Sequence, residues 1–155
     1  YNDVVIYGET CTETCPRAGT ISFNIKKMNH GLVAAILNDY FNIAVRNECF
    51  CAHPYVEKML ELTHSEEINH AKEKLHQMAW HTEPWMGMVR VSFGMYNDKT
   101  EVDLFITAIN DIIKNSDNYS KKYTINIHGD YTHKDFSFSS KDYFSLTNTI
   151  EEQIL

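Results

Sequence analysis

Residues 19–40 change their hydrophobic period within a short stretch, and this change constrains the fold more than any other feature of the sequence. Ile21, Phe23 and Ile25 recur at every second position, which is the period of a half-buried β-strand. The next apolar residues recur at spacings of three and four, the pattern of one helix face: Leu32, Val33, Ile36, Leu37 and Tyr40. A strand followed by an amphipathic helix indicates a two-layer packing of helix on sheet.

The remaining segments continue this mixture of strands and helices. Apolar runs and alternation predict strands at residues 4–7, 41–45 and 87–94, and proline in a first turn favours a short helix at 54–62. Thr63 with Glu66 and Asp98 with Glu101 have the spacing of capping boxes, so each pair predicts the start of a further helix. The second of these helices has an apolar face at three-four spacing, made of Val102, Phe105, Ile109 and Ile112.

Beyond residue 115 the composition becomes polar and aromatic. Here Tyr123, Ile125 and Ile127 are predicted to face a second strand across a turn at 128–130, in a hairpin whose partners are Tyr131 and Phe136 or Phe138. Residues 146–155 suit a short helix or a frayed tail. We therefore expect an α+β domain at 1–115, with a mainly antiparallel sheet and helices on one face, followed by a β-hairpin extension at 116–155.

The acidic balance of the chain argues against two classes of partner. Lys and Arg sum to 14 against 21 Asp and Glu, a net charge of −7, and a chain without a basic stripe is a poor match for nucleic acid or anionic lipid. Because it has no long apolar run and no signal-peptide order, we expect a cytoplasmic protein without a membrane segment. The chain also starts without methionine, inside a strand-like run, so we expect a fragment of a larger polypeptide.

Two thiols lie where a predicted strand ends and a predicted helix begins. Cys51 directly precedes that helix, whose positive dipole end stabilises a thiolate, and Arg46 lies upstream, so Cys51 is the stronger candidate nucleophile. The alternative is that Cys49 and Cys51 are small buried hydrophobic residues. Together with Cys11 and Cys15 they also make two pairs, but a single residue between Cys49 and Cys51 is shorter than zinc-site spacing, so we expect no metal site.

Arg90 lies within an alternating strand and points to the face opposite its apolar neighbours Val89 and Val91. A guanidinium on a rigid strand is suited to bidentate binding of a carboxylate. The alternative for Arg90 is a solvated surface salt bridge.

These stretches resemble the C-terminal part of class V aminotransferases, and within them cysteine desulfurases and selenocysteine lyases. Their motif is Arg-x-Gly-x-x-Cys-Ala-x-Pro, and residues 46–54 read Arg-Asn-Glu-Cys-Phe-Cys-Ala-His-Pro. The resemblance continues through Arg17-x-Gly19, residues 21–25 and residues 89–97, and covers about 1–115. Two positions depart from the motif: Glu48 replaces its glycine, and Cys49-Phe50 replaces the histidines of the best-known members.

The resemblance implies roles for three residues. Cys51 takes the position of the thiol that removes sulfur or selenium from an amino acid, Arg90 that of the arginine that binds the substrate carboxylate, and Arg46 that of an arginine that helps to orient the substrate. It also implies the small C-terminal domain of an enzyme with the aspartate aminotransferase-like fold, dependent on pyridoxal phosphate. The cofactor lysine would lie in a large domain outside this chain, and Lys134 is not expected to replace it.

As a consequence, the isolated fragment is expected to be inactive, and the parent enzyme to be a homodimer. Two alternatives remain open. In the first, the parent is a class V transaminase, lyase or epimerase in which Cys51 is idle. In the second, the chain is a stand-alone interaction module with a structural zinc site built from its cysteines.

Overall fold

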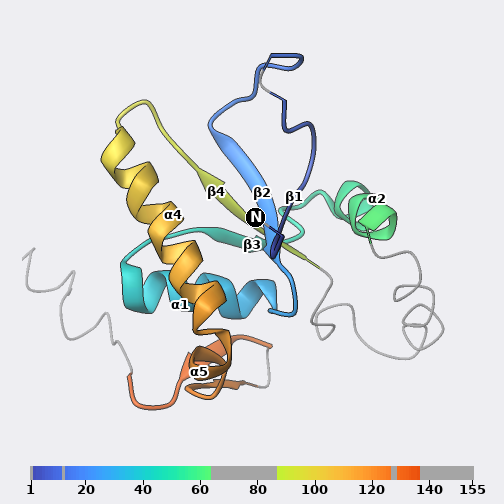
Figure 1. The fold of residues 1–155 in the computed structure, drawn as a ribbon. Helices are drawn as coiled ribbons and strands as arrows, with labels where there is room; N and C mark the ends of the chain where they lie inside the picture. Colours follow the sequence, from blue (N-terminus) through green and yellow to red (C-terminus); the bar gives the residue numbers. More distant parts are fainter. Residues whose placement is uncertain (1, 12, 64–86, 127–128, 137–155) are drawn as a thin grey trace, which may run out of the picture.

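The computed structural model describes residues 2–11, 13–63, 87–126 and 129–136 (Figure 1). Its main sheet is built from four strands: β1 (Val4–Ile6), β2 (Thr20–Ile25), β3 (Arg46–Glu48) and β4 (Met88–Ser92). Their order across the sheet is β1-β2-β4-β3, and every neighbouring pair is antiparallel. Within the described residues, this arrangement confirms the predicted α+β class with its antiparallel sheet.

Two helices, α1 (His30–Phe41) and α4 (Lys99–Lys114), lie over the same face of this sheet (Figure 1). Alternate residues of the strands point to that face, as expected for pleated strands, and Phe23 and Val89 are both buried there. The helices contribute their apolar stripes to the same core, and the side chains in it that are fully enclosed are Val33, Ile36, Leu37, Val89 and Ile112.

The other face of the sheet carries a smaller apolar cluster at one end. Helix α2 (His53–Thr63) packs Val56 and Leu60 against Met88 and Tyr7, and all four side chains are buried. Met88 precedes Val89 in β4 and therefore points away from the main core. The second cluster thus fixes the start of α2 relative to the ends of β3 and β4.

The prediction of a strand at residues 41–45 is wrong. Helix α1 continues to Phe41, and Asn42 follows it in the left-handed conformation with φ 54°. The Asn42 N–H donates to the carbonyl of Asn38 and the Ile43 N–H to that of Leu37, at 3.2 and 3.0 Å. The first bond, from the left-handed residue to a carbonyl four positions earlier, is that of an αL cap, which ends the helix, so the third strand forms only at Arg46–Glu48.

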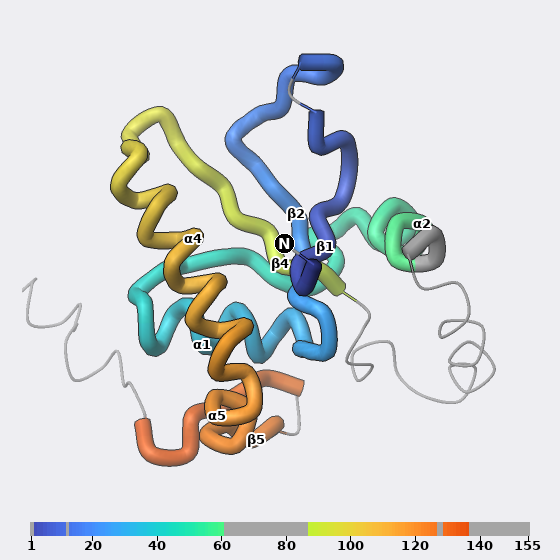
Figure 2. The backbone as a smooth tube through the Cα atoms, viewed as in Figure 1, coloured from blue at the N-terminus to red at the C-terminus, as the bar shows by residue number. Residues whose placement is uncertain are grey.

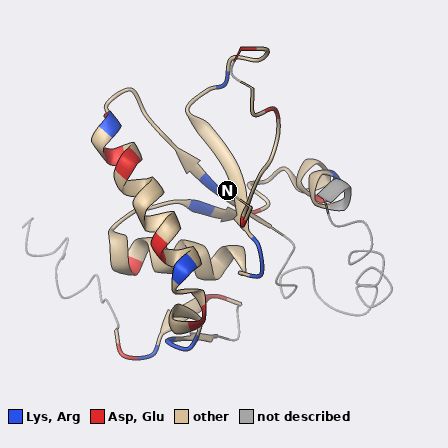
Figure 3. Ribbon diagram, viewed as in Figure 1, with Lys and Arg blue, Asp and Glu red and all other residues tan. Residues whose placement is uncertain are grey.

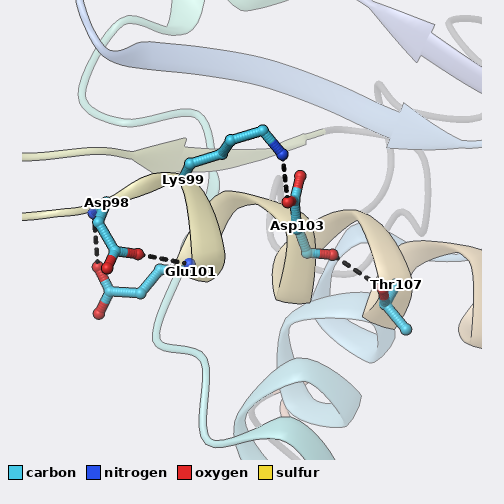
Figure 4. A network of polar contacts seen from close by, with 5 residues as sticks. All are labelled: Asp98, Lys99, Glu101, Asp103 and Thr107. Carbon is cyan, nitrogen blue, oxygen red and sulfur yellow. Dashed lines mark hydrogen bonds and ion pairs between the residues drawn. The ribbon is translucent and has the colours of Figure 1, made fainter.

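Helix α4 begins where its sequence predicted (Figure 4). The Asp98 side chain accepts the N–H of Glu101 at 3.0 Å, and the Glu101 side chain accepts the N–H of Asp98 at 3.1 Å. This is the reciprocal pair of a capping box. Both bonds satisfy N–H groups that the first helical turn leaves without intrahelical partners.

The segment after α4 folds back onto α1 (Figure 2). It forms the short helix α5 (Ser116–Ser120) and a hairpin of β5 (Tyr123–Ile125) and β6 (Tyr131–His133). Tyr123 is buried in the main core and donates to Asp39 of α1 at 2.9 Å. The predicted hairpin is confirmed with a different register, because Tyr123 pairs with His133, whereas Phe136 lies beyond the strand and is exposed.

Some predictions fall outside the described residues. They are the helix expected after Thr63, the hairpin positions Ile127 and Phe138, and the C-terminal stretch 146–155. Among the helices that are described, none combines the length and the apolar character needed to cross a bilayer.

Candidate active site

Three polar side chains form a row across the second face of the sheet. Arg90 in β4 lies directly opposite Ser22 in β2 on one side and Arg46 in β3 on the other. Directly opposed residues of antiparallel strands point to the same face. Figure 3 shows the result as basic segments on the neighbouring strands β3 and β4, in which Arg46 and Arg90 are the only basic residues. The fold therefore brings together the two arginines expected to bind substrate.

Neither arginine is neutralised by an acidic side chain within the described residues, where the ion pair found joins Lys99 and Asp103. The surface salt bridge considered for Arg90 is therefore not observed in this part of the chain. The Arg90 Nε is buried and has no hydrogen-bond partner among the described residues. Two like charges facing each other without a counter-ion favour the binding of an anion between or beside them.

The ring of Phe50 lies against the Arg90 guanidinium. The Arg90 Cζ lies 4.9 Å from the centre of that ring, within the range of a cation–π interaction. Phe50 is half-buried against the small cluster around Val56. Since Phe50 directly precedes Cys51, the thiol loop and the arginine row are in contact.

The loop that carries Cys51 has an uncommon backbone. Glu48, Phe50 and Cys51 have φ angles of 78°, 54° and 62°, in the left-handed region that residues other than glycine rarely adopt. The N–H of Ala52 donates to the carbonyl of Cys49 at 2.7 Å, closing a turn with Phe50 and Cys51 at its centre. Glu48 thus adopts a conformation suited to the motif glycine that it replaces. Strain of this kind in a loop is a feature of functional sites.

The two thiols of this loop differ in their surroundings. Cys51 is exposed, and Ala52 after it caps α2, since its carbonyl accepts the N–H of Val56 at 3.0 Å. Cys49 is half-buried; burial raises the pKa of its thiol, and the charges of Glu48 and Glu57 raise that pKa further. Because thiolates are the reactive form, these surroundings disfavour Cys49 as a nucleophile. Among the described residues, no hydrogen bond joins the Cys51 thiol to either arginine.

Residues of β1 and of the loop after it support the row from the side of β2. The Tyr7 N–H donates to the Ser22 carbonyl at 2.9 Å, and the Arg17 Nη2 donates to the Tyr7 carbonyl at 3.1 Å. The Asn24 Nδ2 donates to the Tyr7 hydroxyl and to the Gly87 carbonyl, at 3.1 and 2.9 Å. These bonds fix β2 at the level of Ser22.

The four cysteines are not grouped as metal ligands within the part of the chain that the structure describes. All four cysteines belong to the described residues and none of them is in a disulfide, and no three His, Cys, Asp or Glu side chains of that part of the chain are grouped as metal ligands. The alternative of a structural zinc module requires four thiolates around one ion. No such group is present among the described residues.

The described residues also do not fit pyridoxal phosphate as a complete site. This cofactor needs a lysine for its Schiff base and a phosphate cradle. Every described lysine except Lys122 is exposed, and Lys122 lies over the rings of Tyr40 and Tyr119. Lys134 is exposed and donates to the Lys121 carbonyl. We therefore derive no step from a cofactor held by this part of the chain.

Sequence reasoning did not assign Ser22 and Phe50 to the site. Ser22 lies between the apolar positions Ile21 and Phe23, so the alternation of side chains along this strand already placed Ser22 on the second face of the sheet. For Phe50, its position next to Cys51 was the only feature of the sequence that pointed to the site. Its contact with Arg90 depends on the pairing of β3 with β4, which the local sequence pattern does not reveal.

The family model that describes class V aminotransferases matches residues 2–105. The match includes the four strands of the main sheet, both arginines of the row and the loop of Cys51, and it ends within α4. Among curated proteins, none matches the chain at a significant level. With two thirds of its residues matched, the chain belongs to the class V aminotransferase family.

Proposed function

We propose that this chain is the small domain of a pyridoxal-phosphate enzyme resembling cysteine desulfurases, and that it supplies the thiol and the carboxylate-binding arginine. One observation carries the proposal. Arg90 lacks a counter-ion among the described residues, faces Arg46, and contacts the residue next to the exposed Cys51. An anion-binding group and a nucleophile are thus presented by adjoining elements.

In this proposal, Arg90 binds the α-carboxylate of an amino acid. A guanidinium offers paired N–H donors that match the two oxygens of a carboxylate. Arg46 on the neighbouring strand adds positive charge and orients the bound amino acid. Binding the carboxylate at a rigid strand directs the remaining groups of the substrate, because one end of the molecule is fixed.

The Cys51 thiolate then attacks the sulfur of the bound cysteine, or the selenium of selenocysteine. A bond forms between the two sulfurs while the carbon–sulfur bond of the substrate breaks, and its electron pair stays with the carbon. That carbon takes a proton and gives alanine, and Cys51 becomes a persulfide. The atoms and electrons of this exchange balance without a further oxidant.

The cofactor belongs to the rest of the proposed enzyme. Pyridoxal phosphate, when bound, acts as the electron sink for charge that develops on the amino acid. We place its lysine in a large domain of the parent protein, with residues 1–115 as the small domain and 116–155 as an extension. The parent is proposed to be a cytoplasmic homodimer, and the isolated chain is proposed to be inactive.

Sulfide release from cysteine by the cofactor-loaded parent protein tests the role of the thiol. In the presence of a reductant, Cys51→Ala is expected to lower kcat by at least about a hundredfold, because no other group takes the sulfur. The matched control is Cys49→Ala, which removes the neighbouring thiol and should retain most of the activity. Normal sulfide release by Cys51→Ala would remove this residue from the mechanism.

Arg90→Ala separates the proposed reaction from the alternative within the same family. Loss of the guanidinium should raise KM for any amino-acid substrate, whether the parent is a desulfurase, transaminase, lyase or epimerase. By contrast, Cys51→Ala harms only a desulfurase. Turnover of other amino acids that is insensitive to Cys51→Ala but abolished by Arg90→Ala would therefore identify the alternative with an idle thiol.

A further inference from the structure

The side chain of Phe50 has a place in the site that neither the family assignment nor the proposed reaction requires. Its ring lies against the Arg90 guanidinium, 4.9 Å from ring centre to Cζ. Phe50 is half-buried and packs with the small apolar cluster of α2, so its ring is held from behind. The contact therefore joins a packed aromatic side chain to the cation proposed to bind substrate.

Within the described residues, Arg90 has few other interactions that could fix its position. Its direct neighbour Arg46 repels it, and no carboxylate of the described residues pairs with it. Its Nε is enclosed without a hydrogen-bond partner among the described residues. A cation held over an aromatic face keeps its in-plane N–H groups free for an anion. With the face covered and Nε enclosed, the terminal Nη pair is the part of the group left for a carboxylate.

The backbone of the thiol loop directs the ring toward Arg90. Phe50 and Cys51 both have positive φ angles, and the bond from the Ala52 N–H to the Cys49 carbonyl closes the turn around them. The two central residues of one turn thus carry the aromatic contact and the exposed thiol. A change in this turn would move both together.

We propose that Phe50 is a positioning residue that holds the Arg90 guanidinium so that its Nη atoms receive the substrate carboxylate, and that it links this cation to the Cys51 turn. The inference rests on the proposed function, since it assigns the carboxylate to Arg90. It adds the requirement for an aromatic face at residue 50, beyond a merely apolar side chain.

The contact is tested first without enzymatic activity, by ¹⁵N NMR of the 155-residue chain. The Arg90 Nε–Hε signal, assigned with Arg90→Lys, is expected to be displaced by the ring current of Phe50. Phe50→Leu should return it toward the position of a free arginine, whereas Phe50→Tyr should retain the displacement. Unchanged backbone amide signals in α4, which packs on the opposite face of the sheet, verify folding. An Arg90 signal that does not respond to Phe50→Leu in a folded chain would overturn the contact.

The positioning role is then tested in the cofactor-loaded parent protein. Phe50→Leu should raise KM for cysteine about tenfold with a smaller change in kcat, because a ground-state carboxylate contact is disturbed. Phe50→Tyr, the matched control, should restore KM to within about twofold of the unmodified enzyme. Equal KM values for Phe50→Leu and Phe50→Tyr would reject the positioning role.

These outcomes are distinct from a failure of the proposed function. If Arg90→Ala leaves KM unchanged, the carboxylate assignment itself is wrong, even when the NMR contact is present. If Arg90→Ala raises KM and Phe50→Leu does not, the assignment of Arg90 stands and the inference about Phe50 fails. Should Phe50→Leu not fold, the comparison of Phe50→Tyr with Phe50→Met provides the same aromatic and non-aromatic pair.

Discussion

The connections that leave the neighbouring strands β3 and β4 follow opposite local rules. After β4, the N–H of Gly94 donates to the Asn97 side chain at 2.7 Å, and Asp98 and Glu101 cap α4 reciprocally (Figure 4). At the end of β3, by contrast, Glu48 has a positive φ angle, as do Phe50 and Cys51 after it. The residue types of the connection after β4 suit its backbone conformation. The connection after β3 holds non-glycine residues in a conformation that is costly for them.

This difference indicates where the chain is selected for something other than stability. Local consistency between residue type and backbone is the normal condition of a folded sequence, and exceptions gather at functional sites. The capped connection only starts a helix, whereas the strained one places Phe50 on Arg90 and exposes Cys51. The comparison therefore supports the site assignment independently of the family motif.

The largest expected effect concerns His30, whose side chain contacts β3 just before the strained connection. His30, at the start of α1, lies 3.5 Å from the Asn47 side chain of β3, from its Nδ1 to the Asn47 Nδ2. A side chain at Gly87 would lie within 2.5 Å of the same ring, so the imidazole is closely enclosed. Burial lowers the pKa of His30 to about 4. The folded protein thus holds this ring neutral where the unfolded chain protonates it.

Stability should consequently fall with acidification. Below the ordinary histidine pKa of about 6.5, the unfolded chain binds a proton that the native state does not bind. The free energy of unfolding is therefore highest above that pH and falls as the pH is lowered toward 4. Between about pH 7 and pH 5 we expect a loss of about 2 kcal/mol. Urea denaturation at both pH values measures it, and His30→Gln should flatten the dependence. An equal slope in His30→Gln would assign the loss to other groups.

The next effect tests the relaxed connection. Asp98→Ala removes the acceptor of the Glu101 N–H and breaks the capping box, and it should lower the free energy of unfolding by about 1 kcal/mol. The matched control is Lys99→Ala, which removes the exposed ion pair with Asp103 and should cost less than about 0.5 kcal/mol. If the two variants unfold at the same urea concentration, the cap contributes no more than a surface charge pair.

Much of the fold was predictable because its signals are local. Alternation in Ile21, Phe23 and Ile25 and the capping pair Asp98 and Glu101 depend only on near neighbours, and both elements formed as expected. Residues 41–45 misled the prediction because Ile43 packs against the core without joining a strand. Its apolar character is satisfied by a helix-ending motif, which hydrophobicity alone does not distinguish from a strand.

The site was less predictable because it depends on contacts between distant segments. Alternation correctly placed Arg90 and Val89 on opposite faces of the sheet. The position of Arg46 beside Arg90, however, follows from the insertion of β4 between β2 and β3. Likewise, comparison of residues 46–54 with the family motif identified Glu48 as a departure from its glycine. Only the structure shows that Glu48 keeps a glycine-like backbone.

Glu48→Gly should sharpen the comparison by relaxing the strained connection. A left-handed conformation costs a residue with a Cβ roughly 1–2 kcal/mol, and the greater entropy of glycine in the unfolded chain offsets part of the gain. We expect a net stabilisation of about 0.5–1 kcal/mol in urea denaturation. Glu48→Ala keeps the Cβ and should show no such gain. Equal stabilisation by alanine would attribute the effect to the lost charge.

The smallest effect concerns the charge of Glu48 rather than its backbone. Burial is the main cause of the raised pKa of the Cys49 thiol, and the carboxylates of Glu48 and Glu57 add to it. Glu48→Gln removes one of these charges and should increase the thiolate fraction of Cys49 at neutral pH. Alkylation by iodoacetamide, followed by peptide mass analysis, reports this fraction.

Cys11 provides the internal reference for that measurement. It is exposed and far along the chain from Glu48, and hydrogen bonds from the Thr14 side chain and from the backbone of Thr14 and Glu13 lower the pKa of its thiol. Its alkylation rate should therefore exceed that of Cys49 and remain unchanged in Glu48→Gln. An increase at both thiols would indicate general loosening of the chain. An increase at Cys49 alone would show that the charge of Glu48 adds to the burial that disfavours the Cys49 thiolate.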